Sequence, residues 1–407
     1  MATSAGAATR VCFFNRSYWP DTGATGQLLT ELAEDLVKIH GFEVTVVTGY
    51  PVAHGQALPS RALHNGVRIV RAAGTTFSPR RFAGRAANYL TYFLSALWTG
   101  LWLPKQDIAV ALTDPPIIGL AALASRPRYG MLFFCQDIFP EVAGLLEDFR
   151  SPLVNAMLER LNRFLVRRAT RIVSLGETMT DRLVQGKGAD RLKVAVVHNW
   201  ADTTAIVPSD KRNQFSIAHG LADRFVVLHA GNIGLGQNLD VVIDAAQILA
   251  PREDVVILFI GDGTRRAALE QVVRDRRLAN VRFLPFQPRE HLRWTYASSD
   301  VCLVSLKPGL AGYIVPSKLY PILAAGRPYI AAVEASSEVS AITARYRCGV
   351  VSSPGDAAAL AAAILSLADD SEGRSAMGAL ARAAASDFSR DRQVATHAEL
   401  LRRMASA

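Results

Sequence analysis

Short apolar runs alternate with segments of helical periodicity along most of this chain. Near the N-terminus, Val11 to Phe14 predicts a strand, Gln27 to His40 a helix with one apolar face, and Phe42 to Thr48 a second strand. Strand, glycine-containing loop, helix and strand in this order form a βαβ unit, whose two strands are parallel. A second series of this kind starts at Phe225 and continues through Ser352. The pattern therefore predicts an α/β protein with two parallel sheets in tandem.

The length of the chain agrees with two domains, because 407 residues exceed what one compact core usually accommodates. A polar stretch without apolar periodicity separates the two series, and we place the linker there. The expected parts are an N-terminal Rossmann-like domain (1–200), a linker (201–222), a C-terminal Rossmann-like domain (223–385) and a final helix that packs back on the N-terminal domain (386–407). Such sheets bind ligands at the carboxyl ends of their strands. We therefore expect the ligands of this protein to bind in a cleft between the two domains.

The stretch from Ser305 to Ala332 combines several local signals. The apolar run from Val301 to Leu306 predicts a buried strand, a Gly/Pro-rich loop follows, and a helix is predicted to begin at Ser317, whose hydroxyl can cap it. Lys318 then lies in the first turn, where a cation opposes the helix dipole. A bound pyrophosphate would accept hydrogen bonds from the free N–H groups and pair with the charge of the lysine, which would explain both features. The alternative is a solvated lysine on an ordinary turn.

Glycines follow two of the predicted strands. Gly231, Gly234 and Gly236 lie where backbone N–H groups can closely approach a ligand, although their spacing is not the dinucleotide fingerprint. In the N-terminal half, Gly23 and Gly26 immediately precede a predicted helix. For these two residues a phosphate-binding loop and a turn that simply needs glycine both remain open.

Two carboxylates and one aromatic residue also follow predicted strands. The run from Leu132 to Cys135 ends in QDIFPE, which places Asp137 and Glu141 at the carboxyl end of a parallel strand. They are the candidate general-base or hydroxyl-binding residues of this half, although such residues often serve only as caps or turn formers. Phe286 follows the predicted strand from Val281 to Leu284 and is placed to cover a nucleobase.

Charge and cysteine content narrow the classes of partner. The chain has 45 Lys and Arg against 36 Asp and Glu, a net charge of +9 that attracts nucleic acid, anionic lipid or phosphorylated substrates. The basic residues are dispersed and do not interleave with aromatics, which disfavours nucleic acid. The four cysteines form no CxxC pair, and the N-terminus has no signal-peptide pattern. We therefore expect no metal site, no disulfide framework and a reducing cytoplasm.

One apolar segment, Ala86 to Pro104, carries no charged residue. Three arginines precede it: Arg80, Arg81 and Arg85. A helix at the level of lipid headgroups, a buried core helix and a true membrane span all remain open, and Trp98 and Trp102 suit the first. The segment from Asn155 to Arg171 adds a basic amphipathic pattern, which indicates either a solvated face or apposition to a membrane.

The chain resembles a GT-B glycosyltransferase of family 4 in six segments that occur in the family's order. They are WPDTGATGQLLTELAEDL, VVHNWAD, AGNIGLGQNLDVVIDAA, FIGDG, VRFLPF and VPSKLYPILAAGRP. The similarity covers nearly the whole chain. It is greatest to the subgroup that assembles bacterial surface polysaccharides of the colanic-acid and O-antigen amino-sugar kind, whose DxxPE pattern QDIFPE matches. The resemblance implies the GT-B fold, two tandem Rossmann-like domains that face each other across a cleft. It also implies that the N-terminal domain (1–200) binds the acceptor and that the C-terminal domain (223–385) binds the nucleotide sugar.

The resemblance also implies an activity. This is transfer of a hexose or amino sugar from a nucleotide diphosphate donor, UDP-linked, with retained anomeric configuration and without a metal ion or other cofactor. The implied acceptor is a polyprenyl-diphosphate-linked sugar or another glycan, met by the N-terminal domain at the cytoplasmic face of the inner membrane. Two alternatives remain open: a GT-B-like nucleotide-sugar epimerase and a catalytically impaired nucleotide-sugar-binding protein.

Site residues follow from the resemblance, with two departures. Asn232 and Gln237 stand where many members have an Arg and a Lys for the diphosphate, and Tyr313 and Pro321 stand where many have two glutamates. Lys318 then becomes the main countercharge for the diphosphate. The implied catalytic residues are Asp137, Glu141 and Lys318. The implied donor-binding residues are Gly231, Asn232, Gln237, Phe286, Tyr313, Ile314, Val315, Pro316, Ser317 and Lys318. The implied acceptor loop contains Thr22, Gly23 and Gly26.

Overall fold

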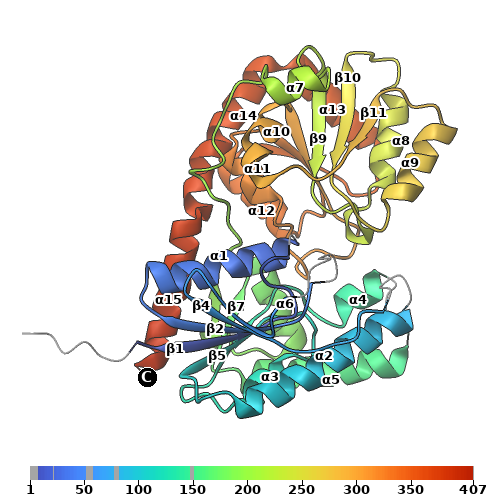
Figure 1. Cartoon of the computed structure of the whole chain (residues 1–407). Helices are drawn as coiled ribbons and strands as arrows, with labels where there is room; N and C mark the ends of the chain where they lie inside the picture. The colour runs from blue at the N-terminus through green and yellow to red at the C-terminus, as the bar shows by residue number, and fades with distance from the viewer. Residues whose placement is uncertain (1–7, 22, 52–57, 78–81, 147–150, 407) are drawn as a thin grey trace, which may run out of the picture. The chain divides into compact units, whose positions relative to one another are not determined.

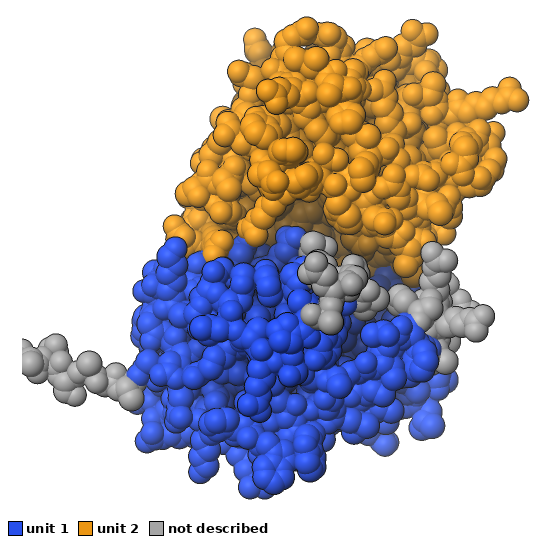
Figure 2. All heavy atoms as spheres, in the orientation of Figure 1, with its two compact units in different colours: residues 1–198, 393–407 blue, residues 199–392 orange. Residues whose placement is uncertain are grey.

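A computed structural model describes residues 8–21, 23–51, 58–77, 82–146 and 151–406. The chain forms two compact units (Figures 1 and 2). Unit 1 comprises residues 1–198 and 393–407, and unit 2 comprises residues 199–392. Each unit contains one sheet that is wholly or almost wholly parallel, covered by helices. The predicted fold class, two Rossmann-like α/β sheets in tandem, is confirmed.

Unit 1 is built on an eight-stranded sheet in the order β3-β4-β2-β1-β5-β6-β7-β8. Its strands are β1 Arg10–Phe14, β2 Glu43–Thr48, β3 Arg61–His64, β4 Val67–Arg71, β5 Ile108–Ala111, β6 Met131–Phe134, β7 Arg171–Ser174 and β8 Val194–Val196. The central strands β5 and β6 are buried at every position, because helices cover both faces of a parallel sheet. Only the β3–β4 pair is antiparallel among these strands, and the sequence analysis had not identified this hairpin.

Unit 1 contains six α-helices in the described residues before α15, and the first of them can be compared with its predicted range. They are α1 Ala24–Lys38, α2 Phe82–Trp102, α3 Gly119–Ala124, α4 Glu141–Leu145, α5 Pro152–Arg168 and α6 Glu177–Lys187, with the 3₁₀ helix η1 Arg191–Lys193. Helix α1 begins three residues earlier than the expected start at Gln27 and ends at Lys38 rather than His40. Its buried face contains Leu29, Leu32 and Leu36, which have the spacing of a helix packed on a sheet.

Unit 2 is built on a six-stranded parallel sheet in the order β11-β10-β9-β12-β13-β14. Its strands are β9 Phe225–Ala230, β10 Val255–Ile260, β11 Val281–Leu284, β12 Val301–Ser305, β13 Tyr329–Ala332 and β14 Gly349–Ser352. Successive residues of β9 join two different cores: Val226 and Leu228 pack on one face of the sheet, and Phe225 and Val227 on the other. The apolar run of this strand is continuous because both of its faces are covered.

The remaining helices belong mainly to unit 2. They are α7 Gln214–Ala218, α8 Asp240–Ile248, α9 Arg266–Asp275, α10 Leu292–Ala297, α11 Leu319–Ala324, α12 Glu338–Tyr346, α13 Ala357–Asp369, α14 Ser371–Ala384 and α15 Arg390–Ala405, with the 3₁₀ helices η2 Leu235–Gln237, η3 Arg289–His291 and η4 Ala385–Phe388. Helix α15 begins in unit 2, and from Gln393 onwards it belongs to unit 1.

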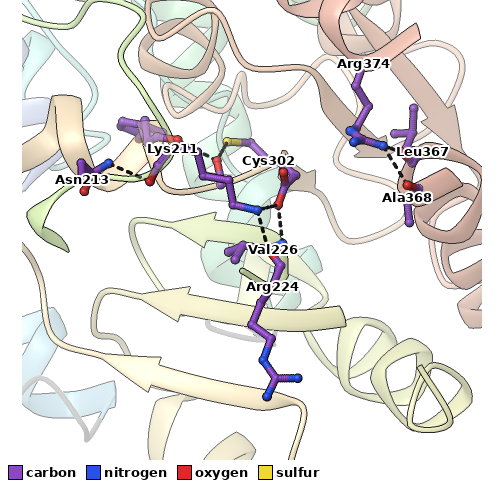
Figure 3. Close-up of polar contacts among 11 residues, drawn as sticks. Lys211, Asn213, Arg224, Val226, Cys302, Leu367, Ala368 and Arg374 are labelled. Carbon is purple, nitrogen blue, oxygen red and sulfur yellow. Dashed lines mark hydrogen bonds and ion pairs between the residues drawn. The ribbon is translucent and has the colours of Figure 1, made fainter. Parts of the chain in front are cut away.

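The stretch in which the polar pattern predicted a linker is attached to unit 2. Lys211 Nζ lies 2.6 Å from Asp300 Oδ2, and the same oxygen accepts a 2.7 Å hydrogen bond from Val226 N (Figure 3). Helix α7 forms within this stretch because the Asn213 side chain accepts from Phe215 N and Ser216 N in a capping box. The polar residues of this stretch thus form helix caps and ion pairs within unit 2.

From Gln393 onwards, α15 packs on the rest of unit 1. Gln393 Oε1 accepts a 3.0 Å hydrogen bond from His198 N, and Arg402 Nη2 donates to His40 O at 3.0 Å. The His397 ring lies 4.9 Å from the Phe134 ring, centroid to centroid, and is almost fully buried. Burial lowers the pKa of His397 to about 3, because a charged imidazolium loses its hydration there.

We predict that His397 makes unit 1 sensitive to acid. Its folded-state pKa lies below the ordinary value of 6.5, so below pH 6.5 the unfolded chain takes up a proton that the folded chain does not. This group alone should remove about 2 kcal/mol of unfolding free energy between pH 7 and pH 5. Urea unfolding of wild type and His397→Phe at both pH values measures the difference. An equal loss in both proteins would contradict the assignment.

Candidate functional site

Three loops meet at the carboxyl edge of the unit 2 sheet, because β9, β10 and β12 are parallel neighbours. They are the glycine loop 231–237 after β9, the loop 261–265 after β10 and the loop 306–318 after β12. Backbone hydrogen bonds tie them together: Gly231 N to Ile260 O, Ile233 N to Asp262 O and Lys307 N to Gly236 O, each 2.8 Å. The loops therefore form one continuous backbone-lined surface.

Glycine is required where these loops approach most closely. Gly261 has φ +146°, and a Cβ atom at this position would lie 1.9 Å from Gly231 O. Gly231 itself has φ +119°, and a Cβ there would lie 3.8 Å from Lys318 Cε. Both φ values are ones that residues with side chains rarely adopt. The glycines thus bring the loop after β9 against the side chain of Lys318.

Lys318 lies at the start of α11, but the helix begins later than the sequence predicted. The first helical residue is Leu319, and Lys318 itself is the N-cap residue, with no side-chain capping hydrogen bond. The predicted start at Ser317 and its role as capping residue are therefore wrong, because Pro316 O and Ser317 O each accept from the amide three residues later in a tight first turn. Helix α11 has only six residues, so its dipole is short. The positive charge at this end of the helix therefore comes mainly from Lys318.

Pro321 fits this helix without loss. It is the third residue of α11 and so lies in the first turn. An N–H group at that position would have no partner within the helix, so proline costs little there.

The ammonium of Lys318 contacts a neutral histidine. Lys318 Nζ lies 3.0 Å from His229 Nε2 and 3.4 Å from Nδ1, and His229 is fully buried. Burial lowers the pKa of Lys318 to about 7, and burial together with the Lys318 charge holds the pKa of His229 well below its usual range. Lys318 forms no ion pair within the part of the chain that the structure describes. An anion bound at Nζ would restore the lysine's ordinary preference for its proton.

The other expected donor-binding residues lie on the same loops, in different roles. Gln237 Oε1 accepts a 3.0 Å hydrogen bond from Gly234 N, so this side chain holds the glycine loop in shape. Phe286 is 58% exposed, and its ring lies beside Gly261. Asn232 is exposed. Tyr313, Ile314, Pro316 and Ser317 are half-buried on the loop that ends at Lys318, and Val315 is buried. Their binding roles stay predictions.

Two carboxylates lie at the carboxyl edge of the unit 1 sheet. Asp137 follows β6, and its N–H donates to Thr113 Oγ1 at 3.2 Å. Burial, followed by the charge of Asp114, raises the pKa of Asp137 to about 6. Asp114 is held by Arg16 Nε at 3.3 Å and Ser17 Oγ at 3.2 Å. Asp137 can therefore exchange a proton near neutral pH or accept a hydrogen bond from a hydroxyl.

Glu141 is the first residue of α4 and is already engaged. Lys187 Nζ lies 2.7 Å from Glu141 Oε1 and 2.8 Å from Oε2, and it also contacts Glu159. The Lys187 side chain is only 1% exposed. These ion pairs join α4 to α5 and α6, so the Glu141 carboxylate has a structural role in unit 1. The sequence analysis missed Lys187, which is 46 residues away along the chain.

The expected acceptor loop precedes α1. Thr22 lies outside the described residues. Gly23 is the N-cap residue of α1, and its N–H donates to Asp21 Oδ1 at 3.0 Å. A Cβ at Gly26 would lie 3.2 Å from Asp21 Cβ. Close packing of the loop on the helix therefore explains Gly26 without a ligand, which was one of the two open alternatives.

Helix α2, which contains most of the uncharged segment, is apolar on two faces. One face is buried and includes Tyr92 and Ala96. The other exposes large apolar side chains: Leu90 53%, Leu94 53%, Trp98 65%, Leu101 49% and Trp102 73%. The reading as a wholly buried core helix is therefore wrong. None of the described helices is both long and apolar enough to cross a membrane. Arg80 and Arg81 lie outside the described residues.

Helix α5 also exposes large apolar side chains. Figure 1 shows α2, α3 and α5 on the same face of the unit 1 sheet. Helix α5 exposes Leu153, Met157 and Phe164. It also carries four exposed arginines: Arg160, Arg163, Arg167 and Arg168. An apolar surface with adjacent cations is typical of sites that meet lipid or protein.

Two family descriptions match this chain. "Glycosyl transferase 4-like domain" matches residues 23–200, and "Glycosyl transferases group 1" matches residues 224–370. The chain belongs to the family 4-like, group 1 glycosyltransferases. The resemblance found in the sequence is thereby confirmed. Within the described residues, no cluster of three or more His, Cys, Asp or Glu side chains is arranged to hold a metal ion.

Known proteins of this family align with much of the chain. "Probable glycosyltransferase WbjE" of Pseudomonas aeruginosa is 28% identical over 264 residues, 63% of this chain and 65% of the relative, so the match spans just under two thirds of that protein. "Putative colanic acid biosynthesis glycosyl transferase WcaI" of Escherichia coli (strain K12) is 26% identical over 352 residues, 81% and 84% of the two chains. The structure of Anabaena Alr3699/HepE in complex with UDP has a TM-score of 0.73 at 17% identity, with 97% and 100% covered.

We predict that Lys187 is needed for the stability of unit 1. Lys187→Met leaves Glu141 and Glu159 without their shared cation. Because both carboxylates keep some exposure to water, the cost should lie below that of a fully buried pair, at about 2 kcal/mol. Denaturant unfolding measures it, with Lys38→Met at an exposed position as the control. A wild-type unfolding midpoint for Lys187→Met would show that the ion pair contributes nothing.

Proposed function

We propose that the protein is a retaining glycosyltransferase that moves a hexose or amino sugar from a UDP-linked donor to a polyprenyl-diphosphate-linked or other glycan acceptor in bacterial surface-polysaccharide synthesis. Family membership, the match to the colanic acid protein WcaI and the fold shared with the UDP complex of HepE support this proposal. The observation that carries it is Lys318, whose partly buried ammonium lies against a glycine loop without a carboxylate partner among the described residues.

Lys318 is assigned to the leaving group. In the transfer, the bond between the anomeric carbon and the diphosphate oxygen breaks, and the oxygen of an acceptor hydroxyl bonds to that carbon on the same face. The proton of that hydroxyl passes to the departing diphosphate. Negative charge grows on the diphosphate as the bond breaks. A preorganised cation stabilises this charge more in the transition state than in the ground state, and one such group contributes about 2.7–4 kcal/mol. In this proposal no metal ion takes part.

Asp137 is assigned to the acceptor or sugar hydroxyls. Its pKa of about 6 leaves it mostly ionised at neutral pH and able to accept a hydrogen bond from a hydroxyl. Of the two carboxylates that the sequence singled out, Asp137 is the better candidate, because the Glu141 carboxylate is paired with Lys187. The proposal thus gives the donor to unit 2 and the acceptor to unit 1.

We predict that Lys318→Ala lowers turnover at least a hundredfold, because one electrostatic contact to the leaving diphosphate is lost. The donor is first chosen from a panel of nucleotide sugars by the rise in melting temperature that each gives with the wild type. Turnover is then the release of nucleoside diphosphate from that donor in the presence of a lipid-linked acceptor. Turnover close to wild type in a folded Lys318→Ala protein would remove this role.

The pH dependence of UDP binding is the control for this variant. Lys318 loses its proton near pH 7 in the free protein, and a bound diphosphate raises the pKa again, so wild-type affinity should fall about tenfold per pH unit above pH 7. Titration of UDP itself affects both proteins equally. Lys318→Ala should therefore lack the additional fall, and parallel curves would show that the lysine does not hold the diphosphate.

The apolar surface of α2 and α5 is assigned to the cytoplasmic face of the inner membrane. Tryptophans beside cations are suited to the headgroup region of anionic lipid, and a lipid-linked acceptor is reached from there. The exposed Trp98 and Trp102 rings lie 5.6 Å apart on α2, and the arginines of α5 supply the positive charge. This surface would make the protein a peripheral membrane enzyme.

We predict that the double variant Trp98→Ser, Trp102→Ser binds vesicles of anionic phospholipid about tenfold less strongly than the wild type, because two large apolar contacts are lost. Vesicle flotation measures the bound fraction. The matched control is Leu63→Ser, Leu192→Ser, which removes two side chains that are 72% and 88% exposed elsewhere in unit 1. An equal loss in both double variants would contradict a specific surface, and so would unchanged binding after neutralisation of Arg80, Arg81 and Arg85.

A further inference from the structure

We propose that His229 is a positioning residue of the donor site, which joins the Lys318 ammonium to the backbone of the glycine loop and so fixes where the positive charge stands. This inference rests on the proposed function, because it takes the diphosphate of a nucleotide sugar as the ligand of Lys318. His229 is not assigned a contact with the donor. It acts through Lys318.

The geometry places His229 between two parts of the site. His229 is the fifth residue of β9 and has no exposed surface. Its Nε2 lies 3.3 Å from Asn232 O in the glycine loop. Lys318 Nζ, from the loop after β12, lies 3.0 Å from Nε2 and 3.4 Å from Nδ1. One imidazole thus touches both segments that line the proposed diphosphate site.

The chemistry of the three groups limits which hydrogen bonds can form. Asn232 O can only accept a hydrogen bond, and the Lys318 ammonium can only donate one. The neutral imidazole donates from one nitrogen and accepts at the other, so it can satisfy both neighbours at once. In the tautomer whose Nε2–H donates to Asn232 O, the accepting nitrogen is Nδ1, 3.4 Å from Lys318 Nζ. In the other tautomer, Nε2 accepts from Lys318 Nζ at 3.0 Å, and the contact with Asn232 O is not a hydrogen bond. Loss of the imidazole would break both links.

A neutral acceptor suits a lysine that must bind phosphate. A carboxylate in the place of His229 would neutralise Lys318 and compete with the diphosphate for it. The imidazole orients the ammonium and leaves its positive charge uncompensated. The Lys187 ammonium in unit 1 is the contrasting case, since it contacts two carboxylates and has no charge left for a ligand.

The ring of His229 is itself held firmly. It lies 5.6 Å from the Phe259 ring in a tilted arrangement, and Phe259 stacks on Phe283 at 4.8 Å. A lysine side chain has four rotatable bonds, and fixing its tip before the ligand arrives reduces the entropy lost on binding. We therefore expect His229 to affect both UDP affinity and turnover.

The test uses the full chain with UDP as the probe, measured by isothermal titration calorimetry at pH 7. His229→Leu removes both hydrogen bonds, whereas His229→Gln keeps an amide that can donate to Asn232 O and accept from Lys318. A hydrogen bond to a charged group corresponds to about a tenfold change in affinity. We expect His229→Leu to bind UDP about tenfold more weakly than the wild type and His229→Gln to remain within about threefold.

A double-mutant cycle separates positioning from a general structural effect. If His229 acts only through Lys318, His229→Leu should change UDP affinity less than about twofold in a Lys318→Ala background. His219→Leu, at a half-buried histidine of unit 2 that packs on Phe215, is the control and should bind UDP as the wild type does. Thermal unfolding of each variant shows whether the fold is retained.

The outcomes distinguish this inference from the proposed function. If wild type binds UDP, Lys318→Ala binds it weakly and His229→Leu binds it normally, the role of His229 is overturned and the proposed function stands. If His229→Leu weakens binding equally in both backgrounds, or His229→Gln is as weak as His229→Leu with an intact fold, His229 does not act through Lys318. If wild type binds no nucleoside diphosphate, the donor assignment falls, and this inference falls with it.

Discussion

Strands within each sheet run parallel, apart from β3, so their carboxyl ends and the loops that follow collect at one edge. This constraint produces both candidate sites. In unit 2 it brings the loops after β9, β10 and β12 together, although these strands are separated by intervening helices in the sequence. In unit 1 it brings Asp137, which follows β6, beside Asp114, which follows β5. Glycines without a Cβ then allow the backbones of neighbouring loops to touch, as Gly261 and Gly231 do.

Lys187, which is buried, and Lys318, which is half-buried, show how the chemistry of the partner separates a structural lysine from a candidate ligand-binding one. Lys187 is surrounded by carboxylates and joins three helices, so its charge is used within the fold. Lys318 contacts a neutral imidazole, and burial lowers its pKa to about 7. A cation kept without a counter-charge among the described residues is costly to the free protein. An anion bound at Nζ would offset that cost, which is why Lys318 rather than Lys187 is the candidate for a ligand contact.

Helix α2 illustrates a different use of apolar residues. A helix that only packs on a sheet needs one apolar face, yet α2 has a second that includes Trp98 and Trp102. The second face contributes nothing to the core of unit 1. Helix α5, which carries several arginines, lies on the same face of the sheet. Exposed tryptophans together with arginines are the combination found in helices that lie at lipid headgroups.

The sequence by itself determined the alternation of strands and helices, the two-sheet fold, the family and the loops that carry glycine and lysine. These features depend on local periodicity and on residues close together in the chain, such as the apolar run of β10 at Val255–Ile260. Only the tertiary structure decided which charges are paired. Glu141 meets Lys187 across 46 residues, and Lys318 meets His229 across 89. It also decided that α11 begins at Leu319 and that α2 keeps an exposed apolar face, because capping and burial depend on neighbours that no local pattern specifies.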